Sequence, residues 1–345
     1  MNTGAIATGT NLKISNYELG YDNLSTNEAL SEARTRGADR MKTKPTVAAI
    51  TVPFDLGAGR RGASKGPKAI LQAGLIRGLQ QMNITIDHMA DIRLPDDTAT
   101  PLAVEVDQTN LKYLAEVIEV NTLLAKQVSQ VVEQGRFPLV IGGDHSIAIG
   151  TLAGLSGHYQ NLGVIWIDAH SDLNSADTSP SGNIHGMSLA ISLGMGHPLL
   201  TSIMGSHDKV KAENIVLIAA RSLDEGEKKL IRSLGIKCYT MYDIDRKGMA
   251  SIMQDAIDYI SSKTDGVHVS FDVDSLDPIE APGTGTIVKG GLHYREAHLA
   301  VEMLHEAGIV TSAEFVEVNP LLDDNNKTSH LAVGLISSLF GKQIL

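Results

Sequence analysis

The feature that most constrains the fold is a regular alternation between short apolar segments and longer segments with helical periodicity. The apolar segments, which we expect to be strands, are TVAAITVPF (46–54), NITID (83–87), FPLVIGG (137–143), GVIWI (163–167), NIVLIAA (214–220), KCYT (237–240), GVHVSFDVD (266–274) and VTSAEFVEV (310–318). Several are continuously apolar, which is typical of strands buried on both faces of a parallel sheet. The alternation therefore predicts an α/β protein in which helices cover both faces of a mostly parallel sheet.

Helical periodicity fills the intervals between these strands. We expect helices from about Pro67, over Gln108–Glu133, from near Ser146, and over Asp224–Ser233, Asp243–Ser262, Tyr294–Ala307 and Thr328–Phe340. Residues 1–44 are polar with little periodicity, so we expect an extension with one short helix around Thr26–Arg34. The sequence has no internal repeat or low-complexity linker, which favours a single domain over residues 45–345.

The composition excludes several classes of protein. The chain has 345 residues, of which 43% are hydrophobic, so it can bury a full core. Its net charge of −11 and lack of a long basic cluster argue against nucleic acid as the main partner. The single cysteine, Cys238, excludes an internal disulfide and a multi-thiolate metal site. No signal peptide or membrane span is recognisable, so we expect a soluble, cytoplasmic protein.

Three clusters rich in aspartate and histidine follow predicted strands. They are GGDHS (142–146), DAHSDLN (168–174) and SFDVDSLDP (270–278), the last with a further acid at Asp277. Ligands of such sheets bind beyond the carboxyl ends of the strands, so the clusters are expected to face one site. A single Asp-x-His or Asp-x-Asp pair is more often a turn or cap. Burying this many carboxylates without a cation would be costly, so three clusters together predict a metal site.

The spacing within the clusters indicates two metal ions. Side chains at every second position of an extended segment project to the same side and can converge on one point. Six ligands exceed the number that one zinc ion takes, and they suit two ions about 3.5–4 Å apart. Oxygen and imidazole ligands favour Mn²⁺, with Fe, Co or Ni as alternatives. The predicted ligands are His145, Asp168, His170, Asp172, Asp272 and Asp274.

A glycine-rich loop offers a different interpretation. Gly57, Gly59 and Gly62 match the G-x-G-x-x-G pattern of dinucleotide-binding proteins, and Asp87 lies near the place of a ribose-binding acid. A lone match of this kind is weak. An oxidoreductase would also leave the metal-ligand clusters unexplained, so we favour a tight loop near the pocket or an oligomer contact.

Further polar residues surround the clusters. The stretch TSPSGNIHGMSLA (178–190) places His185 in a polar loop just after DAHSDLN, where an imidazole can act as an acid or base. Asp224 stands at a predicted helix start, where N-capping is the alternative role. Glu317 ends a predicted strand, where a buried ion pair is the alternative.

The three clusters together resemble the signatures of the ureohydrolase family, which includes arginases, agmatinases and formiminoglutamases. The stretches SGNIHGM (181–187), RSLDEGE (221–227), GTGTIVKGGLHYRE (283–296) and SAEFVEVNPLLD (312–323) resemble its arginase branch, particularly bacterial arginases. The resemblance runs from about Thr46 to the C-terminus and leaves the first forty-odd residues outside. It implies a three-layer α/β/α sandwich, a binuclear manganese centre, and assembly as a homotrimer or homohexamer.

The resemblance also implies a role for each matching residue. One metal would be held by His145, Asp168, Asp172 and Asp272, and the other by Asp168, His170, Asp272 and Asp274. The proton shuttle would be His185. The substrate α-carboxylate would contact Asn174, Ser181 and Asn183, the α-amino group Asp224 and Glu227, and the guanidinium end Thr286 and Glu317. The glycine loop departs from the family pattern at Ala58–Gly59.

These roles imply hydrolysis of L-arginine to L-ornithine and urea. A hydroxide that bridges the metals would attack the guanidinium carbon, with Asp172 accepting its proton. Agmatinase, or another guanidine or amidine hydrolase, is the alternative. Agmatine lacks the α-carboxylate, so the neutral donors and Asp224 favour arginine. A non-catalytic binding protein would be free to lose ligands, but this chain has kept the whole set.

Overall fold

A single parallel sheet organises the described part of the chain, which in this computed structural model is residues 45–94, 110–205 and 208–343. Its order is β2-β1-β3-β8-β7-β4-β5-β6, and every pairing is parallel. The strands are β1 (Val47–Val52), β2 (Ile86–Asp91), β3 (Phe137–Gly142), β4 (Leu162–Ile167), β5 (Ile215–Ala220), β6 (Lys237–Thr240), β7 (Gly266–Asp272) and β8 (Val310–Val316). The predicted α/β class is confirmed.

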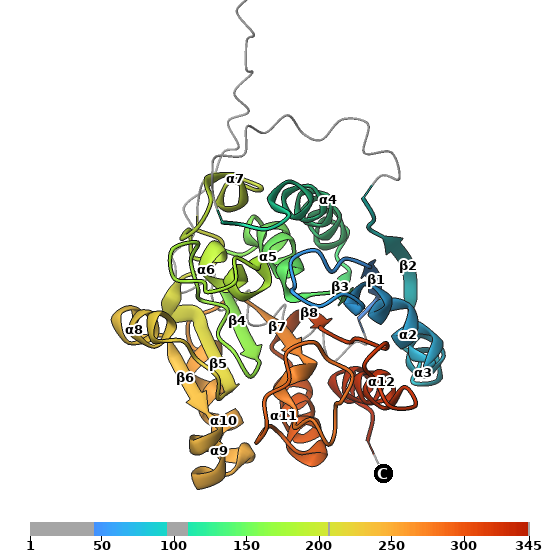
Figure 1. Cartoon of the computed structure of the whole chain (residues 1–345). Coiled ribbons are helices and arrows are strands. Elements are labelled where there is room, and N and C mark those ends of the chain that lie inside the picture. The colour runs from blue at the N-terminus through green and yellow to red at the C-terminus, as the bar shows by residue number, and fades with distance from the viewer. Residues whose placement is uncertain (1–44, 95–109, 206–207, 344–345) are drawn as a thin grey trace, which may run out of the picture.

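Helices cover both faces of this sheet and complete a three-layer sandwich (Figure 1). One face carries α4 (Leu114–Glu133), α5 (Ala148–Ser156), α6 (Ser188–Ser192), α7 (Pro198–Thr201) and α8 (Glu225–Leu234). The other carries α2 (Gly66–Gln72), α3 (Leu75–Gln81), α9 (Met241–Lys247), α10 (Met249–Ser261), α11 (Tyr294–Ala307) and α12 (Lys327–Leu339). No described helix combines the length and hydropathy needed to cross a bilayer.

Two hydrophobic cores result, one on each face of the sheet. Successive side chains of a strand point to opposite faces, so each inner strand feeds both cores. In β4, Ile165 and Ile167 join the core beneath α10 and α11, whereas Val164 and Trp166 join the core beneath α4 and α5. This double burial explains why the inner strands read as continuous apolar runs.

Several predicted boundaries are wrong. The single helix predicted from Pro67 is split at Gly74, and the one over 243–262 is split at Gly248, where φ is 99° and 80°. Such positive φ angles interrupt an α-helix. The edge strand β2 covers 86–91 instead of 83–87, and α4 begins at Leu114. The predicted helix at 26–34 lies outside the described residues, as does the whole extension 1–44.

The strand order decides where the three clusters meet. β3 and β4 follow each other along the chain, but β8 and β7 lie between them in the sheet. The carboxyl ends of β3, β8, β7 and β4 are therefore neighbours. Each of these four ends carries one of the polar segments noted in the sequence.

Candidate metal centre

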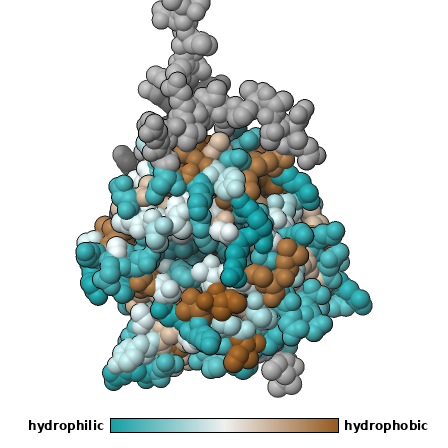
Figure 2. Space-filling model, in the orientation of Figure 1, coloured by the Kyte–Doolittle hydropathy of each residue, from teal (hydrophilic) through white to brown (hydrophobic). Residues whose placement is uncertain are grey.

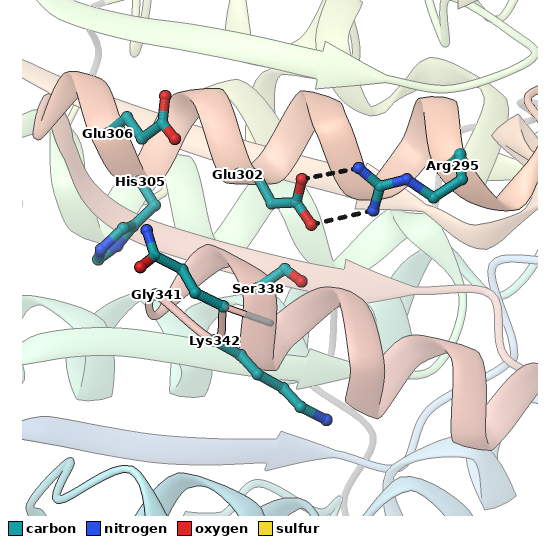
Figure 3. Close-up of a pocket in the computed structure, with 8 residues that line it drawn as sticks. Arg295, Glu302, His305, Glu306, Ser338, Gly341 and Lys342 are labelled. Carbon is teal, nitrogen blue, oxygen red and sulfur yellow. Dashed lines mark hydrogen bonds and ion pairs between the residues drawn. The ribbon is translucent and has the colours of Figure 1, made fainter. Parts of the chain in front are cut away.

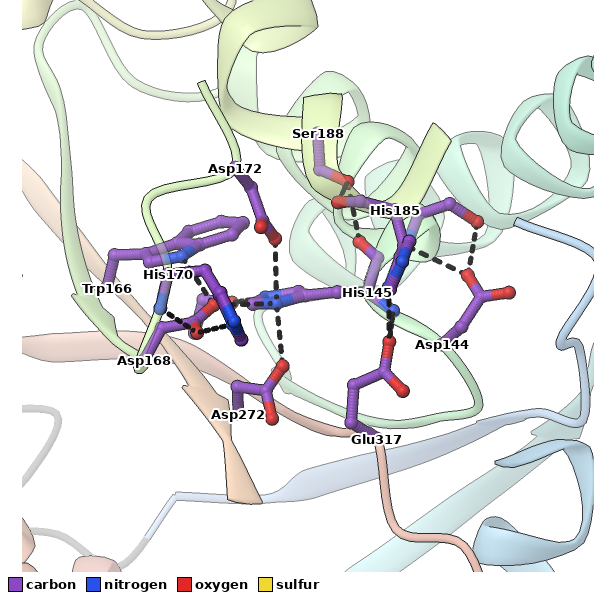
Figure 4. Close-up of polar contacts among 12 residues, drawn as sticks. Asp144, His145, Trp166, Asp168, His170, Asp172, His185, Ser188, Asp272 and Glu317 are labelled. Atoms are coloured by element: carbon purple, nitrogen blue, oxygen red, sulfur yellow. Dashed lines mark hydrogen bonds and ion pairs between the residues drawn. The ribbon is translucent and has the colours of Figure 1, made fainter. Parts of the chain in front are cut away.

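A compact cluster of carboxylates surrounds His145, which begins the turn after β3 (Figure 4). Its Nδ1 lies 3.1 Å from an oxygen of Asp168, 3.1 Å from one of Asp172 and 3.2 Å from one of Asp272. All four side chains are buried. The two aspartates of the β4 segment and the one that ends β7 therefore converge on one imidazole nitrogen. The predicted extended geometry is wrong, because residues 168–170 form a bend and Asp172 has a φ of 50°.

A second cluster shares Asp168 with the first. His170 Nδ1 lies 3.3 Å from Asp168 Oδ1 and 3.2 Å from Asp274 Oδ2. Because the two oxygens of Asp168 face different imidazoles, this carboxylate stands between the clusters. The structure thus brings all six predicted ligands together in two adjacent groups.

The donor set fits divalent metal ions. His145 Nδ1 is buried and forms no hydrogen bond of acceptable geometry, although three carboxylate oxygens surround it. An imidazole lone pair among carboxylates is an arrangement typical of Mn²⁺ and similar ions. Two divalent ions would also balance the charges of the four aspartates, which would otherwise repel one another in a buried space.

Ionisation in this cluster responds to the same crowding. Burial opposes protonation of His145, but the surrounding carboxylates raise its pKa well above the ordinary value. Burial likewise opposes protonation of His170, yet Asp274 and Asp168 raise its pKa to about 12. Burial and the nearby Asp168 charge raise the pKa of both Asp172 and Asp274 to about 6. The cluster therefore holds protons where a metal ion would supply positive charge.

Neighbouring side chains fix the ligands, and the sequence reading did not assign them this role. The indole of Trp166 stacks on His145 with ring centroids 4.1 Å apart, and its Nε1 donates to Asp168 over 3.0 Å. Arg221 donates to the backbone oxygens of Asp274 and Ser275 over 2.7 and 3.0 Å, which holds the turn after β7. Trp166 is the only tryptophan of the chain and directly precedes the β4 cluster, which was an available signal.

A cavity of about 120 Å³ opens beside the two clusters. Four of the predicted ligands form its base. Its lining residues are His170, Asp172, Asn174, His185, Gly186, Ser222, Asp224, Glu227, Asp272, Asp274 and Thr286. Five predicted catalytic or substrate-binding residues outside the ligand set therefore face the same space as the ligands.

Asn174 and Asp224 form one wall of this cavity. Asn174 Nδ2 donates to Asp224 Oδ2 over 2.9 Å, and Asp224 also caps the start of α8. Glu227 is held more tightly, since it accepts hydrogen bonds from Ser171 Oγ, Leu173 N and Asp224 N. These three hydrogen bonds connect Glu227 to the segment after β4 and to Asp224. Glu227 therefore mainly holds Asp224 in place in the cavity wall.

Ser181 and Asn183 lie in the loop before His185, and neither is among the residues that line the described cavity. Ser181 is exposed, and its hydroxyl accepts from Asn183 N over 3.2 Å. The glycine loop packs against this loop, since His185 N donates to Gly57 O over 3.2 Å. A Cβ at Gly57 would lie 2.4 Å from Ser146 Oγ, so this glycine allows close packing. The glycine loop therefore lies against the segment that carries His185, one of the cavity-lining residues.

His185 and Glu317 form a pair beside the metal ligands (Figure 4). His185 Nδ1 lies 3.0 Å from Glu317 Oε1, which also accepts from His145 N over 2.9 Å. Burial opposes protonation of His185, but Glu317 raises its pKa to about 9. Glu317 has a positive φ of 65°, an uncommon conformation that turns the chain out of β8. This pair thus supplies a protonated imidazole next to the cavity.

Asp144, the acid of the GGDHS segment, lies against the glycine loop. It is fully buried and accepts hydrogen bonds from Ala58 N and Ser146 N over 3.0 and 2.9 Å. Asp277, the third acid of its cluster, instead accepts from the backbone of Ile279 and Gly290. Asp144 therefore joins the loop to the β3 end, whereas Asp277 closes a turn.

A second cavity, of about 160 Å³, lies between α11 and the end of α12 (Figure 3). The Arg295 guanidinium, which lines this cavity, already forms two hydrogen bonds of 3.2 and 3.1 Å to Glu302. None of its lining residues belongs to either metal-ligand cluster. The cavity at the strand ends is therefore the better candidate for an active site.

Comparison with known proteins gives a consistent result. Residues 45–341 match the arginase family. The chain is 58% identical over 299 residues to the arginase of Bacillus caldovelox and 55% identical over 300 residues to that of Bacillus subtilis strain 168, covering 87% of this chain and 99% of each relative. The crystal structure of the Bacillus caldovelox arginase superposes with a TM-score of 0.82 at 55% identity, covering 87% of this chain and 100% of that one. The chain therefore belongs to the arginase family.

Proposed function

We propose that this protein is an arginase, which hydrolyses L-arginine to L-ornithine and urea. The observation that carries the proposal is the convergence of two histidines and four aspartates at the ends of β3, β4 and β7, beside a cavity walled by Asn174 and Asp224. Membership of the arginase family, and high identity to relatives named arginase, support the same activity.

We propose Mn²⁺ as the metal, with Fe, Co or Ni as alternatives that the same ligands accept. His145, Asp168, Asp172 and Asp272 would hold one ion, and His170 and Asp274 would hold the other together with Asp168 and Asp272. When bound, such a pair lowers the pKa of a bridging water so that hydroxide is available near neutral pH.

The protein side chains would orient the guanidinium group and move protons. Glu317 and Thr286 would face this group, because Thr286 lines the cavity and Glu317 pairs with His185, which also lines it. Asp172 would accept the proton released as the nucleophile adds to the guanidinium carbon. His185 carries a proton at neutral pH because Glu317 raises its pKa to about 9, so it can protonate the departing ornithine amine.

The rest of the cavity would recognise the amino-acid head group. Asn174, which lines the cavity, would donate to the α-carboxylate together with Ser181 and Asn183 of the loop before His185, and Asp224 would supply a negative charge for the α-amino group. Glu227 would serve chiefly through the hydrogen bond that it accepts from Asp224 N over 2.7 Å. A site built around such polar contacts rejects analogues that lack the matching groups, and agmatine has no α-carboxylate.

The decisive experiment measures urea release from L-arginine and from agmatine in parallel. The purified chain is reloaded with Mn²⁺, and a chelated sample serves as the control. Metal-dependent urea from arginine alone is the expected result. Urea from agmatine instead would retain the metal centre and overturn the head-group contacts, whereas no urea from either compound would favour another amidine substrate or a binding role.

We also propose the organisation of the whole chain. Residues 45–345 form one catalytic domain, a division supported by the family match that begins at residue 45. We propose a cytoplasmic homotrimer or homohexamer, by likeness to the family. Figure 2 shows hydrophobic patches on an otherwise hydrophilic face, and Tyr242, Ile279 and Leu321 are exposed hydrophobic residues. Light scattering of the full chain would test the oligomeric state. The same measurement on a chain that lacks residues 1–44 would test whether residues 45–345 fold and assemble as one domain.

A further inference from the structure

The second ring nitrogen of His145, Nε2, is the first member of a buried chain of polar side chains that has no role in the proposed reaction. His145 Nε2 lies 2.7 Å from Ser270 Oγ, and Ser270 Oγ donates to Glu314 Oε1 over 2.8 Å. Ser270 and Glu314 are register partners on β7 and β8, and both are completely buried. Neither side chain belongs to the metal-ligand clusters or lines the described cavity.

The direction of these hydrogen bonds fixes the proton on His145. A serine hydroxyl has one hydrogen, and here that hydrogen points to the Glu314 carboxylate. Ser270 Oγ must therefore accept from His145 Nε2. With a proton on Nε2, Nδ1 is the nitrogen left to bind a metal, and it lies 3.1–3.2 Å from the three aspartate oxygens. This is the tautomer that a histidine needs in order to bind a metal through Nδ1.

The chain continues to a second buried histidine. His268 Nε2 lies 3.4 Å from Glu314 Oε1, and His268 Nδ1 lies 2.9 Å from Ser312 Oγ. His268, Ser270 and Asp272 occupy every second position of β7, so they share one face of the sheet. Burying this polar stripe in the core carries a cost that hydrophobic residues would avoid, which indicates a role.

We propose that Glu314, acting through Ser270, is a positioning residue for the metal that His145 binds. It holds the imidazole in one tautomer and orientation, and its negative charge strengthens the imidazole as a donor to the metal. Glu314 neither lines the described cavity nor belongs to the metal-ligand clusters, so it acts through another residue. The inference rests on the proposed metal centre. It adds Ser270 and Glu314, which act on the ring nitrogen of His145 opposite the one that would bind the metal.

The test is a Mn²⁺ titration of metal-free protein by calorimetry, with the parent chain and the variants Ser270→Ala, Glu314→Gln and Ser270→Ala/Glu314→Gln. We expect each single variant to bind Mn²⁺ about 10–100-fold more weakly. Because the hydrogen-bonded route from Glu314 to His145 runs through Ser270, the double variant should lose little more affinity than Ser270→Ala. Ser270→Thr retains a hydroxyl and should preserve most of the affinity for Mn²⁺. If Glu314→Gln does not fold, the comparison of Ser270→Thr with Ser270→Ala still tests the role of the hydroxyl.

Ser312→Ala is the matched control, since it removes an equally buried hydroxyl from the same polar stripe without breaking the link to His145. It should bind Mn²⁺ with parental affinity. Parental affinity in Ser270→Ala, or additive losses in the double variant, would overturn the inference while leaving the metal centre intact. A parent chain that bound no Mn²⁺ would overturn the choice of metal, and the positioning role with it.

Discussion

At the scale of single residues, few side chains around the site can be changed without loss of stability, because buried polar atoms such as those of Glu227 already take part in hydrogen bonds. Glu227 illustrates this constraint: one carboxylate accepts from a hydroxyl and two backbone amides that belong to separate segments. Removing such an acceptor leaves buried donors unsatisfied, which costs more than the hydrogen bonds themselves contribute. Stability and activity can therefore be separated by choosing which residue to change.

Glu227→Ala should mainly destabilise the fold. Its loss leaves Ser171 Oγ and Leu173 N without their acceptor, for a cost of about 2–4 kcal/mol. Urea denaturation of the metal-free protein measures this change. Glu225→Ala is the control, because Glu225 lies on the same helix with its side chain 76% exposed and forms an ion pair with Lys228. If the two variants were equally stable, Glu227 would not hold the wall.

Glu317→Gln should mainly impair catalysis. The amide keeps the shape of the side chain but loses the charge that faces the guanidinium group and His185, so kcat/KM for arginine should fall by about 100-fold or more. Steady-state urea assays at saturating Mn²⁺ measure this effect. Glu296→Gln, which changes a half-buried residue in the first turn of α11 and outside the described cavity, should leave kcat/KM unchanged. Parental kcat/KM in Glu317→Gln would remove Glu317 from the catalytic set.

At the scale of elements, the chain uses glycines to end one helix and begin the next. α9 and α10 meet at Gly248, which adopts a φ of 80° and a ψ of 147°. An α-helical pattern runs across this point in the sequence, so periodicity alone predicts one helix. The local backbone conformation, which an L side chain rarely adopts, decides that there are two.

Gly248→Ala should therefore cost about 1–3 kcal/mol of folding free energy, although a Cβ there would have open space. Gly157→Ala makes a matched control, because Gly157 also has open space but an ordinary φ of −77°. It should be neutral or slightly stabilising. Chemical denaturation of both variants distinguishes backbone strain from packing, and equal effects would contradict the assignment of strain to Gly248.

At the scale of the whole molecule, metal binding and folding are linked through protons. The pKa of His185 is raised to about 9, and the pKa values of Asp172 and Asp274 are raised to about 6. A raised pKa means that the folded chain binds more protons than the unfolded chain, so metal-free stability falls as pH rises through these values. Metal ligands must lose their protons to bind, so Mn²⁺ affinity changes in the opposite direction.

The difference in Tm between Mn²⁺-loaded and chelated protein should consequently widen as pH rises toward about 6, where the ligands Asp172 and Asp274 lose the protons that compete with Mn²⁺. His170, a proposed ligand whose pKa is raised to about 12, extends this trend above pH 6. Differential scanning calorimetry at several pH values gives this difference directly. A difference that stayed constant with pH would show that the metal-free cluster does not hold the protons assigned to it.

The sequence by itself determined the fold class and the six expected metal ligands. Continuous apolar strands can be covered only by helices on both faces, and alternate positions of an extended segment must point the same way. Both rules act over a few residues, so they can be read without a structure. The same locality explains why α2 and α3 were predicted as one helix.

Only the tertiary structure decided the rest of the site. Placing β8 and β7 between β3 and β4 brings Glu317 beside His185, 132 residues away, and Glu314 behind His145 through Ser270. No local pattern marks Glu314 or Arg221, because each looks like an ordinary strand or loop residue in sequence. Their partners lie on other strands, so their roles follow from strand order and register, which the chain fixes only when the whole sheet has formed.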